Sequence, residues 1–318
     1  MTDLLQSPGL TADDLLQAPP GRHPLRRIVR RRPSAAFGAL LLLLFVMLAV
    51  LAPLITPHGA NHRVGGVYEA PSRRHWLGLD DAGIDVVSLL IEGSRISLLI
   101  GVAAMTVSMV VGGGVGLLAG YFGGAADAVL MRVTDYFLVV PALPLMIVIA
   151  AIWKPSVTHI VLVIGLLLWT WTARIIRAQV KSVRERVYVK RARAMGAGHC
   201  RIIFRHVLPQ IAPLLSANVV LTVAYAIFYE TALSFLGLGD PTSASWGTML
   251  RHAFERTAIS SGAWWAVVPP GVCISLVVMG CYLVGQAIED GLNPRLRISH
   301  LSPRSFRLKE LPAERPGL

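Results

Sequence analysis

Six long apolar runs constrain the possible folds of this chain more than any other feature. They cover residues 35–55, 96–120, 128–153, 157–173, 211–236 and 263–288. A helix needs about 20 mostly apolar residues to cross the roughly 30 Å hydrocarbon core of a bilayer, and each run is of that order. Only 15% of the 318 residues are charged, whereas an ordinary soluble domain has about a quarter. The sequence therefore predicts an all-α membrane protein with six transmembrane helices.

Positive charge lies unevenly around these runs. If residues 1–34 are cytoplasmic, the cytoplasmic segments hold 23 of the 30 Lys and Arg residues and the opposite side holds 7. Cytoplasmic loops of membrane proteins carry such an excess, so we expect both termini in the cytoplasm. In a soluble protein a net charge of +12 would suggest nucleic acid. Here the basic clusters flank apolar runs, so we expect no nucleic-acid partner.

This orientation divides the chain into tails, helices and loops. The expected parts are a cytoplasmic tail (1–34), a first helix (35–55), an extracytoplasmic segment (56–95), a five-helix core (96–290) and a cytoplasmic tail (291–318). Within the core we expect a basic cytoplasmic loop (174–210) and an outer loop (239–262). These connections are too short for a separate soluble domain.

The chain lacks the short motifs that mark catalysis or nucleotide binding, such as a phosphate-binding loop or the HExxH and GxSxG patterns. We therefore expect no enzyme activity and no bound cofactor, and transport energy would come from a gradient or from a partner. Imidazole suits nickel, and an outer nickel site would draw on His58, His62, His75, Asp80, Asp81 and Asp85. Their spacing is not that of a ligand set, so we expect no metal site.

The basic loop is the most informative segment. Residues 181–195 have the composition of a helix, and Gly196 and Gly198 interrupt it. Residues 201–208 can form a second short helix that Pro209 would end. A helix–glycine–helix knob is a shape that docks another protein. The alternative is a basic loop that lies on anionic lipid.

Residues 188–209 resemble the cytoplasmic "EAA" loop of bacterial ABC importer permeases. The positions that match are Ala192, Gly196, Leu208 and Pro209. Lys190 and Arg191 stand where the family has Glu and its first Ala. Three further stretches resemble the dipeptide/oligopeptide/nickel permeases of this class: residues 75–97, 230–250 and 289–297. The resemblance spans about residues 35–297 and is closest to the C-type permease subunit.

The resemblance implies a type I ABC importer permease in a bacterial inner membrane, surrounded by lipid. It implies a second homologous permease, two ATP-binding subunits that use ATP and Mg, and an extracytoplasmic substrate-binding protein. Short peptides are the expected cargo, with nickel or another small solute as the alternative. The implied ATPase-coupling residues are Tyr188, Ala192, Met195, Gly196, Arg201, Phe204 and Pro209. The implied outer docking residues are Asp240, Trp246 and Gly247.

Charged residues within the apolar runs raise a different possibility. A carboxylate such as Glu230 is costly in a membrane and should face protein or water. It could form part of a path or gate, or it could pack against the partner permease. Asp135 is three residues from Arg132 and is expected to pair with it. A gradient-driven transporter would have to rely on Glu230 and Asp135. Trp246 is also a candidate interfacial anchor.

Overall fold

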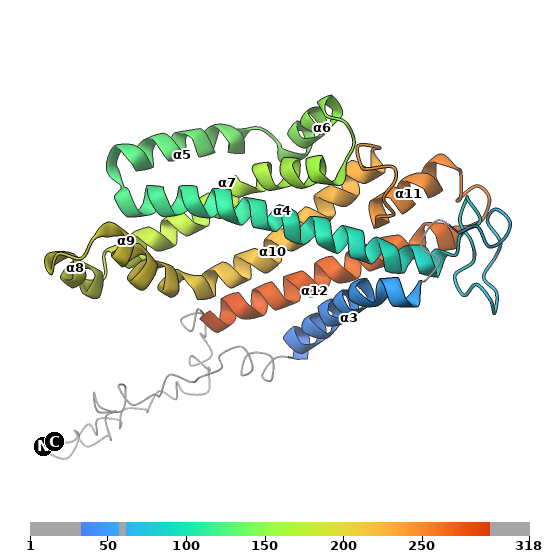
Figure 1. Cartoon of the computed structure of the whole chain (residues 1–318), viewed down its shortest axis with the longest axis horizontal. Helices are drawn as coiled ribbons and strands as arrows, with labels where there is room; N and C mark the ends of the chain where they lie inside the picture. The colour runs from blue at the N-terminus through green and yellow to red at the C-terminus, as the bar shows by residue number, and fades with distance from the viewer. Residues whose placement is uncertain (1–32, 57–61, 293–318) are drawn as a thin grey trace, which may run out of the picture.

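The computed structural model describes residues 33–56 and 62–292, and most of these are helical (Figure 1). The long helices are α3 (Pro33–Ile55), α4 (Val86–Phe122), α5 (Gly124–Val139), α7 (Val157–Arg184), α10 (Leu208–Phe235) and α12 (Val268–Leu292). The shorter elements are α6 (Ala142–Ile152), α8 (Val187–Ala194), α9 (His199–Ile202), the π-helical turn η2 (Ile203–Val207), α11 (Trp246–Glu255) and the 3₁₀ turn η3 (Trp264–Ala266). Most of the two predicted tails, residues 1–32 and 293–318, lies outside the described part.

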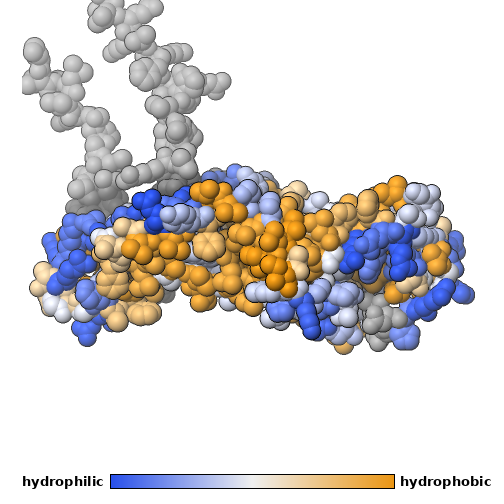
Figure 2. Space-filling view, turned by 90° about the horizontal axis from the view of Figure 1, so that it is seen from above, coloured by the Kyte–Doolittle hydropathy of each residue, from blue (hydrophilic) through white to orange (hydrophobic). Residues whose placement is uncertain are grey.

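Two ends of the molecule differ in character (Figure 1). Residues 185–207, which we call the knob, project at one end, the knob end. Residues 62–85 and 236–263 gather at the other, the loop end. Figure 2 shows apolar side chains over the middle of the face in view and hydrophilic side chains at both ends. This distribution is that of a protein whose middle lies in lipid.

Within residues 33–56 and 62–292, five helical stretches are long and apolar enough to cross a membrane: 33–55, 86–122, 157–184, 215–235 and 264–291. The third predicted run is a broken pair, because α5 and α6 meet at 87°. Pro141 lies at this break, and proline cannot donate the backbone hydrogen bond that would continue α5. The prediction of an all-α membrane protein is confirmed, with the third of the six runs bent rather than straight.

Two helices extend beyond their apolar runs. Helix α4 begins at Val86 rather than Ile96, because the Asp85 carboxylate accepts a 2.9 Å hydrogen bond from the Ser88 N–H and caps it. Helix α7 continues to Arg184, although its apolar run ends at residue 173. Charged residues therefore end the apolar runs without ending the helices.

Helices α4 and α7 pack against each other through glycine. Gly112, Gly116 and Gly120 are spaced four residues apart and lie on one face of α4. A Cβ on Gly112 would lie 2.3 Å from the Trp169 carbonyl oxygen, and a Cβ on Gly116 would lie 2.5 Å from that of Ala173. Small residues allow such close backbone approach between membrane helices. Gly112 and Gly116 of the second predicted span thus serve helix packing.

Candidate functional site

The turn between α8 and α9 gives the knob its shape. Gly196 has φ +80°, a left-handed conformation that favours glycine. Its N–H donates to the Arg193 carbonyl (3.0 Å), and the Ala197 N–H donates to the Ala192 carbonyl (3.0 Å). These two bonds form the Schellman motif that commonly ends a helix. The predicted helix–glycine–helix order is confirmed, although the first helix is divided into the end of α7 and the separate α8.

The knob is built on a packed base. Val189 and Ile202 are buried in a cluster with the ends of α4 and α7, and Ala192 of α8 is buried as well. The buried Tyr121 of α4 anchors this contact, since its hydroxyl lies 3.0 Å from His199 Nδ1. Arg184 donates to the Tyr121 carbonyl at 3.0 Å. Because of these contacts, a movement of the knob would also displace the ends of α4 and α7.

Most of the predicted coupling residues lie on the exposed side of the knob. Met195 is 82% exposed and Phe204 is 69% exposed. The other exposed members of the predicted set are Tyr188, Gly196, Arg201 and Pro209. Ala192 is the exception, because it is buried in the base and offers no surface to a partner.

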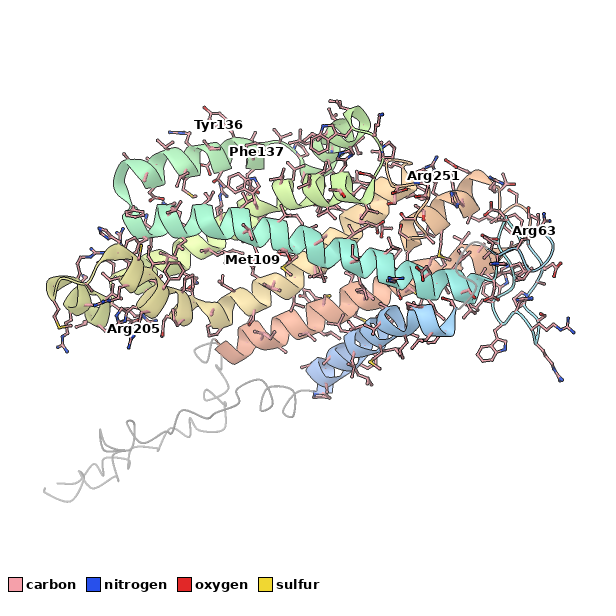
Figure 3. All side chains as sticks on the ribbon, in the orientation of Figure 1. Arg63, Met109, Tyr136, Phe137, Arg205 and Arg251 are labelled. Atoms are coloured by element: carbon pink, nitrogen blue, oxygen red, sulfur yellow. The ribbon has the colours of Figure 1, made fainter. Side chains whose placement is uncertain are left out.

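Positive charge surrounds these apolar side chains. The exposed basic residues of the knob are Arg186, Lys190, Arg191, Arg193, Arg201 and Arg205, and Figure 3 labels Arg205 at this end. Lys190 pairs with Glu185 at 3.0 Å, and this contact, together with Arg184, lowers the pKa of the Glu185 carboxyl. The lysine at the family's Glu position thus has an acidic partner within the knob.

Pro209 does not end the second knob helix, contrary to expectation. Helix α9, the π turn η2 and α10 follow one another without a break from His199 to Phe235. Pro209 lies in the first turn of α10, immediately after the wider π turn. Proline is tolerated in a first turn because its missing N–H has no essential partner there. The knob is consequently continuous with a membrane-length helix.

Ion pairs join α5 to the knob end of α7. Asp127 of α5 binds Lys181 Nζ at 2.8 Å and Arg177 Nη2 at 2.8 Å, with Arg177 Nε as a further donor. Asp135 pairs with Arg174 at 2.6 Å rather than with Arg132. The expected pairing with Arg132 was wrong because α7 brings a cation from outside the helix.

Loss of the Asp127 pair should weaken the attachment of α5. Asp127→Asn leaves two partly exposed cations without their carboxylate, and we expect the free energy of unfolding to fall by about 1–3 kcal/mol. Asp135→Asn is the matched control, because both partners there are about half exposed, and such pairs contribute about 0–1 kcal/mol. Thermal unfolding of both variants in detergent, followed by tryptophan fluorescence, measures the difference. Equal stability of the two variants would contradict the attachment.

The outer docking residues divide into one surface residue and two buried ones. Asp240 is partly exposed, and hydrogen bonds from Thr242 hold the pKa of its carboxyl below the usual range. Trp246 is 0% exposed and Gly247 is buried. In this conformation neither can contact a docking protein, and Trp246 is no interfacial anchor. Gly93 of α4 opens the space that the Trp246 ring fills, since a Cβ there would lie 2.8 Å from the ring.

The loop end also contains a pocket of about 220 Å³ beside α11. Its rim includes Asp80, and burial raises the pKa of that carboxyl. Arg256 closes one side, where it pairs with Asp81 at 3.4 Å and its carbonyl accepts from the Tyr68 hydroxyl at 3.2 Å. Residues 62–85 are thereby fastened to the segment that follows α11.

The side chain of Glu230 is completely buried by other residues of this chain. It is 0% exposed, and it accepts hydrogen bonds from Ser97 Oγ at 3.3 Å and Ser234 Oγ at 2.8 Å. No part of its carboxylate reaches a path or a partner subunit in this conformation. Sequence reasoning found the residue but not its role, because Ser97 is 133 positions away.

A hollow of about 420 Å³ lies between α7 and α10. Its lining includes Trp171, Asn218, Leu221, Thr222, Tyr225 and Tyr229. The lining residues are neutral, and several carry hydroxyl or amide groups. These residues belong to no short motif, so sequence reasoning could not single them out.

The histidine and aspartate residues considered above as a nickel site form no ligand cluster in the described part of the chain. Among residues 33–56 and 62–292, no three His, Cys, Asp or Glu side chains are arranged to hold a metal ion. His75 Nδ1 lies 3.1 Å from Asp85, and His58 is outside the described residues.

Known proteins resemble this chain over most of its length. The family model "Binding-protein-dependent transport system inner membrane component" matches residues 112–298. The model "N-terminal TM domain of oligopeptide transport permease C" matches residues 25–71. The dipeptide transport system permease protein of Alkalihalophilus pseudofirmus is 34% identical over 288 residues, which is 90% of this chain and 93% of that protein. The oligopeptide transport system permease protein of Mycobacterium tuberculosis is 35% identical over 276 residues, with 86% and 94% covered.

A solved structure shares the fold. An inward-facing structure of the MetNI methionine ABC transporter aligns with a TM-score of 0.50 and 17% identity. The alignment covers 66% of this chain and 97% of that chain.

Proposed function

Since the chain belongs to the family of binding-protein-dependent transport system inner membrane components, we propose that it is one half of the translocation path of an ATP-driven importer of short peptides. A second homologous permease would supply the other half. Two ATP-binding subunits would dock at the knob end, and a substrate-binding protein would dock at the loop end. The knob would then be cytoplasmic and the membrane a bacterial inner membrane. The chain itself would catalyse no reaction.

The observation that carries this proposal is the surface of the knob. Met195 and Phe204 are large apolar side chains held in solvent by a rigid base. Exposed apolar groups rimmed by charge are typical of protein contact sites. The basic rim favours an acidic partner surface, and opposite charges would guide its docking.

The connection from the knob to the membrane helices supports a coupling role. The knob follows α7 and continues through η2 into α10, and α7 and α10 are the helices that line the hollow. Closure of the ATP-binding subunits would pull the knob and tilt these two helices. Rigid-body rocking of packed helices is a common way to open a path to alternate sides.

The character of the hollow fits a peptide path. Asn218, Thr222 and Tyr225 can exchange hydrogen bonds with peptide groups. The absence of charge in its lining would allow peptides with different side chains to pass. The peptide and dipeptide permeases among the relatives favour this cargo over nickel.

The energy source tests the proposal. In cells that express the transporter, uptake of a labelled tripeptide is expected to fall to background when ATP is depleted and the membrane potential is kept. It should persist when a protonophore collapses the proton gradient and ATP is maintained. The reverse pattern would identify a gradient-driven transporter and overturn the proposal.

A further inference from the structure

A fully buried carboxylate without a cation marks the loop end of α10. All the side chains that hydrogen-bond to Glu230 are hydroxyls, from Ser97 of α4, Ser234 of α10 and Ser245 before α11. Among the described residues, no Lys, Arg or His forms an ion pair with it. Burial of a charge or polar group is costly unless hydrogen bonds compensate. The arrangement therefore depends on all three elements being in place.

The donors and acceptors around the carboxylate can be assigned. The Trp246 N–H donates to Ser97 Oγ at 3.3 Å, and the Thr248 N–H donates to Ser245 Oγ at 3.2 Å. Each serine thus accepts from the first turn of α11 and keeps its single hydroxyl hydrogen for Glu230. The first N–H groups of a helix have no partner within the helix. Glu230 is thus linked to these N–H groups through the hydroxyls of Ser97 and Ser245, which we call the serine relays.

Close packing leaves the three elements little freedom. A Cβ on Gly247 of α11 would lie 2.7 Å from Ser234 Cβ, and a Cβ on Gly239 would lie 2.5 Å from Ser234 Oγ. The Trp246 indole N–H also donates to the Leu90 carbonyl of α4 at 3.1 Å. Helices α4, α10 and α11 therefore meet at one point around Glu230.

We propose that Glu230 is a positioning residue that fixes α11, and the loop-end surface beside it, on α4 and α10 through this hydroxyl network. Trp246 and Gly247 then act as buried supports of that surface rather than as contact residues. The consequence for transport depends on the proposed function. A substrate-binding protein docked beside α11 would move α4 and α10 with it, because α11 packs directly against both helices.

Hydrogen exchange measured by mass spectrometry tests this role. The full chain is purified from its native membrane in mild detergent with whatever subunits accompany it. In Glu230→Ala, amide exchange in residues 246–255 is expected to rise at least about fivefold, because the lost network leaves hydroxyls and N–H groups unsatisfied. Glu230→Gln keeps the size of the side chain but only one of the two acceptor oxygens, so its exchange should lie between those of the wild type and Glu230→Ala.

Two serine variants complete the test. Ser97→Ala removes one relay while the Glu230 side chain is kept, and it should also raise exchange in α11, so the proposal stays testable if Glu230→Ala does not fold. Ser275→Ala is the control, because in the described part of the chain that hydroxyl donates to the Gly271 carbonyl of its own helix and takes no part in the network around Glu230. Unchanged α11 exchange in both Glu230→Ala and Ser97→Ala would overturn the proposal.

This exchange result does not depend on the energy source or the cargo. A failure of the ATP-depletion experiment would remove the proposed function and leave the fixing of α11 intact. An unchanged exchange pattern would remove the role of Glu230 and leave the import function intact.

Discussion

Gly196→Arg is expected to abolish peptide uptake while the chain still inserts and folds. Gly196 has φ +80°, where a residue with a Cβ is destabilised by about 1–2 kcal/mol. No atom lies within 4 Å of the position that its Cβ would take, so the core is not disturbed. The new side chain would stand on the exposed surface next to Met195. The backbone strain alone corresponds to a factor of roughly 5–30 in an equilibrium, and we expect uptake to fall at least about tenfold.

Variants at a neighbouring glycine distinguish the effect of backbone strain from the effect of side-chain size. Gly198 also has open space around it, but its φ of −64° suits any residue. Gly198→Ala should therefore transport like the wild type, whereas Gly196→Ala should be impaired. Uptake of a labelled tripeptide is measured at equal amounts of membrane-inserted protein. Normal uptake by Gly196→Arg would contradict the coupling role of this turn.

Gly112→Val should prevent the assembly of the helix pair at the centre of the protein. A Cβ at this position would lie 2.3 Å from the Trp169 carbonyl oxygen and 2.9 Å from Thr172 Cβ. The first neighbour is backbone and cannot move aside without separating α4 from α7. Overpacking of a core usually destabilises by about 1–3 kcal/mol and sometimes by more. We expect the upper end of this range, because the neighbouring Gly116 contact would be lost as well.

Gly114→Val is the matched control on the same helix. Nothing lies within 4 Å of the position that a Cβ would take there, and valine has a better helix propensity than glycine. The two variants are compared by the amount of monodisperse protein extracted from membranes and by its unfolding temperature. Gly112→Val should be lost or unfold far below Gly114→Val. Equal yields and equal unfolding temperatures would show that the α4–α7 contact is not as close as described.

The apolar runs sufficed to predict the helices because the bilayer leaves few alternatives for a run of that length. The ends of the helices were less predictable, because a helix can continue through charged residues once it has left the lipid. The basic second half of α7 after residue 173 illustrates this. The effect of a proline on a helix also depends on its position, which the sequence does not reveal. Pro141 breaks the third span, whereas Pro209 is accommodated in a first turn.

Contacts between distant parts of the chain explain most of what the sequence could not predict. Trp246 resembles a surface aromatic in sequence, but its buried site needs the missing Cβ of Gly93 and the contact with Phe45, which is 201 positions away. Asp135 has a cation three residues away, yet it binds Arg174 on another helix. The knob was more predictable, because its turn is encoded locally by Gly196.

The docking of an ATP-binding subunit on the knob is the central claim, and crosslinking from Phe204 tests it most directly. A photo-reactive amino acid replaces Phe204, membranes from the native host are irradiated, and the adducts are identified by mass spectrometry. The same amino acid at Leu40, an exposed apolar position in α3, is the control for lipid contact. We predict that position 204 yields an adduct with a chain that carries a phosphate-binding loop, and that position 40 does not. If position 204 yields only lipid adducts in membranes that transport peptide, the knob lies on lipid and the coupling account is contradicted.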